Sequence, residues 1–195
     1  GTRPTTGEKS VASPAPVVAD KSIAVLPFTN MSDEKENGLF GDGVQEDILT
    51  NLALVRELRV VSRTSVAQYR DTKKPMRDIG RELGVTYLLE GSVRKAGNRI
   101  RITAQLINAA DGFNLWSERF DRDLDDIFAM QDEIARAIVD KLKAGLERSR
   151  DLPLVKPSTD NLEAYQLYLQ GRYHWNQRGA GLVKGLHLFE AALAH

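Results

Sequence analysis

The segment from residue 85 to residue 121 constrains the fold more than any other part of the chain. Apolar and polar side chains alternate along it, most clearly over residues 100–106. Two turn signals interrupt it, Gly-Asn at 97–98 and Asp-Gly at 111–112. Alternation with period two indicates strands that have one buried face, and such dipeptides favour tight turns between antiparallel neighbours. The sequence therefore predicts three consecutive antiparallel strands.

The sequence before this segment has the pattern of a strand, a helix and a second strand. Residues 22–28 form an apolar run that fits a buried strand, and the polar residues 29–37 that follow are typical of a loop. A helix is expected next, with Asp42 as its N-cap and Gln45 completing a capping box. Residues 58–62 resemble another strand, so the two strands are expected to lie parallel.

Helical patterns also flank the three strands. A short helix is predicted within 62–70, capped by Ser62, and another after Pro75 that ends at Gly84. The longest amphipathic pattern runs from about 125 to 145. These elements predict an α+β fold, in which a mixed sheet of about five strands has helices packed on one face.

Proline-containing stretches divide the chain. Residues 1–20 and 148–160 have linker compositions, which leaves an α/β domain at 21–147 and two helices at 161–195. The two helices need a neighbour to pack against. We therefore expect the chain to be a fragment of a larger modular protein, in which the helices meet the α/β domain, another chain or further repeats.

The composition excludes several classes of function. Lys+Arg and Asp+Glu are both 27, so no net charge favours nucleic acid or an anionic membrane. There are no cysteines, which excludes disulfides, thiol catalysis and thiolate metal sites. No run of 18 apolar residues is present, so we expect no direct membrane insertion by this piece.

A glycine-rich stretch before the first helix is the candidate ligand site. Gly41 and Gly43 could let backbone amides meet an anion, with Asp42 and Glu46 beside them. The spacing matches neither a dinucleotide-binding nor a P-loop fingerprint, and a helix cap is the simpler interpretation. The acidic residues between 33 and 47 lack the spacing of a calcium loop, so no metal site is predicted.

No catalytic set is recognisable. The histidines, at 174, 187 and 195, all lie in the tail, without a zinc-type pair. The α/β segment has none to activate a serine. We therefore assign no catalytic residue and no cofactor.

Four aromatic residues are candidates for a partner-binding surface. Trp116 and Phe120 alternate on one predicted strand, and Tyr168 and Trp175 lie on the first tail helix. Core packing and anchoring between domains are the alternative roles.

Four segments, in this order, carry a resemblance to a known family: Ile23-Ala24-Val25-Leu26-Pro27-Phe28, Phe40-Gly41-Asp42-Gly43, Tyr87-Leu88-Leu89-Glu90-Gly91-Ser92-Val93 and Leu115-Trp116-Ser117-Glu118-Arg119-Phe120. Over roughly 21–146 the chain resembles the TolB amino-terminal-like domain of bacterial signalling proteins. The tail resembles the start of a tetratricopeptide repeat, although Gly185 stands where such repeats prefer alanine.

The resemblance implies a role in signal transduction. Such domains commonly follow an adenylate/guanylate cyclase domain or a winged-helix regulator, often behind a membrane anchor. We expect a non-catalytic sensory or protein-interaction module, with a small-ligand or nucleotide receptor site near Gly41–Glu46 as the alternative. The expected partners are proteins or further repeats, and self-association is compatible with the sequence. By analogy the module would face the periplasm, with the cytoplasm as the alternative.

Overall fold

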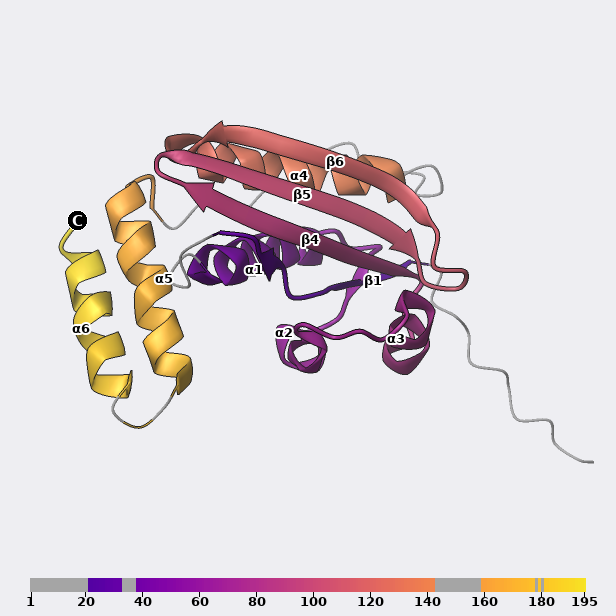
Figure 1. Ribbon diagram of the computed structural model, residues 1–195, viewed down its shortest axis with the longest axis horizontal. Helices are drawn as coiled ribbons and strands as arrows, with labels where there is room; N and C mark the ends of the chain where they lie inside the picture. The colour runs from indigo at the N-terminus through magenta and orange to yellow at the C-terminus, as the bar shows by residue number, and fades with distance from the viewer. Residues whose placement is uncertain (1–20, 33–37, 143–158, 178, 180) are drawn as a thin grey trace, which may run out of the picture.

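A computed structural model describes residues 21–32, 38–142, 159–177, 179 and 181–195. Its centre is a mixed sheet with the strand order β3-β1-β4-β5-β6, to which the short β2 adds by pairing with β4 (Figure 1). The strands are β1 (Ser22–Val25), β2 (Thr29–Asn30), β3 (Arg59–Val60), β4 (Tyr87–Ala96), β5 (Arg99–Asn108) and β6 (Asn114–Asp123).

Long and short helices surround the sheet. The long helices are α1 (Gly38–Ala53), α4 (Ile127–Leu142), α5 (Leu162–Gln177) and α6 (Gly181–Leu193). The shorter ones are α2 (Arg63–Val66), η2 (Ala67–Tyr69), α3 (Met76–Leu83) and η3 (Leu124–Asp126). None of the helices in the described ranges has the length and apolar character needed to cross a membrane.

The sheet confirms the predicted strands. β4, β5 and β6 are antiparallel neighbours, and β1 runs parallel to both β3 and β4. The turn signals coincide with the two connections, where Gly97 and Gly112 take positive φ values of 55° and 79°. The α+β class and the mixed sheet are therefore as expected.

Two cores lie on opposite faces of the sheet. The larger core is packed between the sheet and the long helices α1 and α4, with Val44, Ile102 and Ile134 fully buried. The smaller core lies under α2, η2 and α3, around Leu88 and Ile79. The expected placement of helices on one face holds for α1 and α4, and the short helices add a partial layer on the other face.

Three local predictions were wrong. Residues 29–30, expected in a loop, form β2 and pair in parallel with β4. α1 begins at Gly38, so Asp42 lies inside the helix and is not its cap, and Gln45 instead donates from Nε2 to the carbonyl of Val25 at 2.9 Å. Ser62 stands at the start of α2 but makes no capping hydrogen bond.

The tail forms the expected helical hairpin, at one end of the molecule beside α1 (Figure 1). α5 and α6 cross closely at two glycines. A Cβ at Gly185 would lie 2.9 Å from the carbonyl oxygen of Gly171, and a Cβ at Gly171 would lie 2.6 Å from the ring of Phe189. Tetratricopeptide repeats, which the tail resembles, prefer alanine at the position of Gly185. An alanine here would therefore force the two helices apart.

The domain boundaries stay predictions. Residues 1–20, 143–147 and most of the second predicted linker lie outside the described residues.

Candidate functional site

A glycine on α1 lets the helical hairpin approach the α/β domain. A Cβ at Gly43 would lie 2.6 Å from Cδ2 of Leu169 and 2.9 Å from Oη of Tyr165, both on α5. Real Cβ atoms do not come so close to a neighbour, so a side chain here would force Leu169, Tyr165 or α5 itself to move. Gly43 thus defines the α1–α5 junction, the contact surface between these two helices.

Tyr165 is the polar anchor of this junction. It is 6% exposed, and its hydroxyl donates to Oδ2 of Asp47 at 2.6 Å. The same hydroxyl accepts a hydrogen bond from Nε2 of Gln131 at 3.0 Å, so one tyrosine connects α5 with both α1 and α4. The ring of Phe128 packs edge-on against it, with centroids 4.9 Å apart.

Burial changes the acid–base properties of this cluster. Desolvation raises the pKa of Asp47, although the hydrogen bond from Tyr165 and the charge of Arg172 act against the shift. Burial and the neighbouring Asp47 raise the pKa of the Tyr165 hydroxyl well above its ordinary value. The tyrosine therefore stays a hydrogen-bond donor throughout the physiological range.

An ion-pair network borders the junction. Oε2 of Glu46 accepts a hydrogen bond from Arg172 of α5, and Nε of Arg63 on α2 lies 3.7 Å from the same oxygen. Asp42 pairs with Arg70 at 2.6 Å. The Arg172 side chain is only 15% exposed, so its pair with Glu46 is the better shielded of these contacts from solvent.

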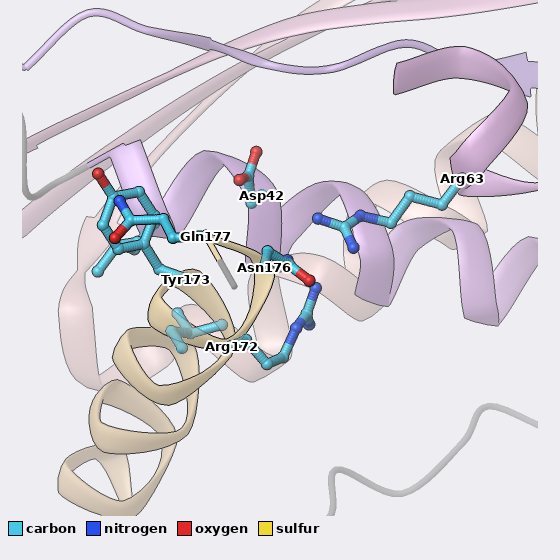
Figure 2. Close-up of a pocket in the computed structure, with 9 residues that line it drawn as sticks. Asp42, Arg63, Arg172, Tyr173, Asn176 and Gln177 are labelled. Carbon is cyan, nitrogen blue, oxygen red and sulfur yellow. The ribbon is translucent and has the colours of Figure 1, made fainter. Parts of the chain in front are cut away.

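A small cavity of about 140 Å³ lies beside this network (Figure 2). Arg63 extends into it from α2, while Arg172 and Asn176 project from α5. Ligand pockets are commonly about 300–1,000 Å³, so this cavity suits a few waters or a small ion better than a nucleotide. It contains part of the site predicted from the sequence, since Asp42 and Gly43 also line it.

The structure separates the four predicted ligand residues. Gly41 faces the sheet, where its Cβ would lie 3.3 Å from the carbonyl oxygen of Phe28. Asp42, Gly43 and Glu46 face the hairpin or its border. The glycines thus allow close packing on two sides of one helix. Over the described ranges, no three His, Cys, Asp or Glu side chains gather closely enough to hold a metal ion.

The four predicted partner-binding aromatics fall into different environments. Phe120 is 2% exposed and belongs to the larger core, and Trp116 packs against that core with its ring centroid 6.4 Å from that of Phe120. Tyr168 and Trp175 are 41% and 49% exposed, and both rings contact Phe189. The two residues of α5 therefore retain surface for a partner, whereas Phe120 serves the core.

Sequence reasoning missed the residues that join the two parts. Tyr165 lies on the same helix as the predicted Tyr168 and Trp175, but nothing in the sequence linked it to its polar partners Asp47 and Gln131. The one local signal was Gly43 within an otherwise apolar helical pattern, because glycine is unfavourable there unless another backbone or side chain approaches.

The fold and the junction define an α+β domain on which a helical hairpin is docked. The chain belongs to the HilA/YgeH-like transcriptional regulator family, whose second-domain model matches residues 19–137. It is 48% identical over 162 residues to a putative adenylate cyclase 3 of Rhizobium meliloti (strain 1021), a match that covers 83% of this chain and 28% of that protein. The chain thus spans little more than a quarter of that relative.

Solved structures with a similar fold include TolB of Acinetobacter baumannii, with a TM-score of 0.48, 16% identity and coverage of 64% of this chain and 28% of that one. Another is the carboxy-terminal domain of LpoB from Salmonella enterica, with a TM-score of 0.44, 19% identity and coverage of 55% and 86%. The resemblance drawn from the sequence is confirmed at the level of a domain of transcriptional regulators and adenylate cyclase-like signalling proteins.

Proposed function

We propose that the chain is a non-catalytic module that couples a signal to the output of a larger signalling protein through the position of its helical hairpin. In this proposal the α/β domain is the TolB-like part, and the hairpin is the first unit of a tetratricopeptide-like array. The family match and the cyclase relative support the setting. The α1–α5 junction carries the argument for the role.

The junction has the properties of a defined interface between two parts. The glycine at 43 and the Tyr165 hydroxyl fix one orientation of α5 on α1, because the first needs close contact and the second needs aligned partners. A polar group that is buried with matched partners makes alternative arrangements costly. A signal that moves α1 would therefore move the hairpin with it.

The hairpin also presents an apolar surface away from the junction. Leu182 and Leu186 lie one turn apart on α6 and are 38% and 51% exposed. Exposed apolar stripes of this kind commonly mark protein–protein contacts. We propose that this α6 stripe receives a protein partner or a following repeat.

Site-specific photo-crosslinking in cells that make the parent protein tests the partner surface. A photoreactive residue at Leu186 should give a discrete protein adduct, and the exposed Arg119 on β6 is the matched control position. Val183→Asp, an exposed change at the edge of the stripe, should reduce the adduct. Equal, diffuse labelling at both positions would refute a specific surface.

The non-catalytic part is tested on the purified chain. Incubation with ATP or GTP and a divalent metal should give no cyclic nucleotide above a heat-inactivated control. Steady turnover that copurifies with the chain would overturn this part of the proposal. A small-ligand site near Gly41–Glu46 remains the alternative, and the small cavity that Asp42 and Gly43 line supports a small ion as its ligand.

The compartment follows from the parent protein and is proposed as periplasmic for a membrane-anchored parent, with the cytoplasm as the alternative. Labelling of a cysteine introduced at the exposed Arg119 by a membrane-impermeant maleimide in intact cells distinguishes the two. Labelling requires access from outside the inner membrane, so its absence before lysis would place the module in the cytoplasm.

A further inference from the structure

A second and larger cavity lies on the other side of the α1–α5 junction. It is a groove of about 610 Å³ between α1 and α4 on one side and α5 and α6 on the other. This volume falls within the range that is usual for small-molecule sites. The groove is separate from the 140 Å³ cavity, with which it shares no lining residue.

The two walls of the groove differ in chemistry. The wall from α1 and α4 carries Asp47 and Asp132, both half-buried, whereas the wall from α5 and α6 carries Tyr168, Phe189 and Leu193. A compound that fits both walls has a charged or polar end and an apolar body. The groove thus selects for an amphiphilic ligand.

The sign of the charge follows from the groups that face the groove. No Lys, Arg or His lines it among the residues that the structure describes. The Arg172 guanidinium, which acts on Asp47 from nearby, is already paired with Glu46. Within the described residues, Oδ1 of Asp132 accepts a side-chain hydrogen bond from Nδ2 of Asn51 at 3.2 Å. Ionised carboxylates accept hydrogen bonds but cannot donate them, so a donor with positive charge fits this wall.

Aromatic rings in the groove favour the same ligand. Organic ammonium groups are attracted to aromatic faces. The Arg172 guanidinium already lies 5.4 Å from the Tyr168 ring centroid, so the Phe189 ring, 6.0 Å from that of Tyr168 on the hairpin wall, is the one offered to the ligand. Burial raises the pKa of Asp47, which indicates a carboxylate whose charge is incompletely compensated. A bound cation would supply that compensation.

We propose that this groove binds a small organic ammonium ion with an apolar body, the ammonium directed to Asp47 and Asp132 and the body against Phe189 and Leu193. Because its walls come from both parts of the chain, such a ligand would stabilise the docked hairpin. The inference thereby deepens the proposed coupling role and names the class of signal that acts on it.

Calorimetric titration of the full chain with three probes of one skeleton tests the proposal. The probes are 4-phenylbutylammonium, 4-phenylbutanol and 4-phenylbutanoate, which differ in charge at one end. We expect the ammonium to bind about tenfold more tightly than the alcohol, and the carboxylate to bind most weakly. Equal affinity of ammonium and alcohol, or no binding of the ammonium up to its solubility, would overturn the proposal.

Variants locate the site. Asp132→Asn keeps an acceptor for Asn51 and should lower the affinity for the ammonium to near the affinity for the alcohol. The exposed Asp126→Asn makes the same charge change outside the groove and should leave the affinity for the ammonium unchanged. Ala192→Phe should fill the groove and weaken the binding of all three probes. Undiminished binding to Ala192→Phe would place the ligand elsewhere and refute the assignment. The crosslinking test at Leu186 does not involve the groove, so the two proposals can fail separately.

Discussion

Replacement of Gly43 by alanine separates two effects of opposite sign. Alanine in a helix interior is favoured over glycine by about 0.5–1 kcal/mol, so helix propensity alone predicts a more stable protein. The new Cβ would, however, lie 2.6 Å from Cδ2 of Leu169 and 2.9 Å from the Tyr165 hydroxyl. Overpacking of this kind costs about 1–3 kcal/mol.

The two terms leave an expected net loss of about 1 kcal/mol. The leucine methyl groups could shift, but Leu169 is only 4% exposed, and the Tyr165 hydroxyl is held by hydrogen bonds to Asp47 and Gln131. Movement of α5 is therefore the expected response. Amide exchange in residues 162–177 should accelerate, while exchange in the strands of the sheet stays slow.

A double-mutant cycle makes the test sharper. Leu169→Ala removes the methyl groups that the new Cβ would meet, at its own cost of about 2–5 kcal/mol. In that background Gly43→Ala should cost less, because two of the three closest contacts of the new Cβ are gone and the one with the Tyr165 hydroxyl remains. Urea unfolding gives the free energies, and the pair Thr50→Gly and Thr50→Ala, at an exposed position of α1, measures the propensity difference between glycine and alanine. If Gly43→Ala stabilises the otherwise unchanged chain and leaves α5 exchange unaltered, the close-contact argument is refuted.

Four further predictions follow from other contacts. Tyr165→Phe should cost about 1–3 kcal/mol and speed amide exchange in α5, because Asp47 loses its donor; unchanged exchange would contradict the anchor role. Gly80→Ala should lower Tm in a thermal scan, since its Cβ would meet that of Ala109 at 2.4 Å, and a raised Tm would show that α3 yields freely. Burial raises the pKa of Asp47 above 3.8. Between pH 3.8 and this raised pKa the folded state binds more protons than the unfolded one, so stability falls as the pH rises through this window. Asp47→Asn should flatten this slope in unfolding curves measured across the window, and an unchanged slope would refute its origin. The pH dependence from Asp121 has the opposite sign, because Arg101 and Arg99 lower the pKa of this carboxyl below 3.8. The stability that the ionised Asp121 contributes should be present above pH 3.8 and be lost as the pH falls through the lowered pKa. Asp121→Asn should lack this loss.

The elements that the sequence predicted well are those whose causes are local. The strands β4 to β6 follow from alternation and from turn dipeptides a few residues apart, and the stop of α3 follows from Gly84, whose φ is 63°. β2 was missed because two residues carry no periodicity, and its pairing depends on β4, more than sixty residues away. The sequence contains both strands but not the register between them.

The junction could not be predicted for a related reason. The contact between Tyr165 and Asp47 spans 118 positions, and that between Arg172 and Glu46 spans 126. Tyrosine on an aromatic helix face and aspartate on an acidic helix face are each ordinary surface patterns when taken alone. Their pairing becomes visible only when the hairpin is placed on α1.

The glycines at 41 and 43 show how helix position decides between two functions for the same residues. An anion site at a helix N-terminus uses backbone N–H groups of the first turn, which have no partner inside the helix. α1 begins at Gly38, so the N–H groups from Asp42 onward lie within the region where a helix satisfies its own donors. Gly43 is therefore unsuited to an amide-based anion site, and its missing side chain has a steric use, the contact with Leu169. The sequence placed the helix start at Asp42, four residues later than the structure does, and therefore assigned both glycines to the stretch before the helix.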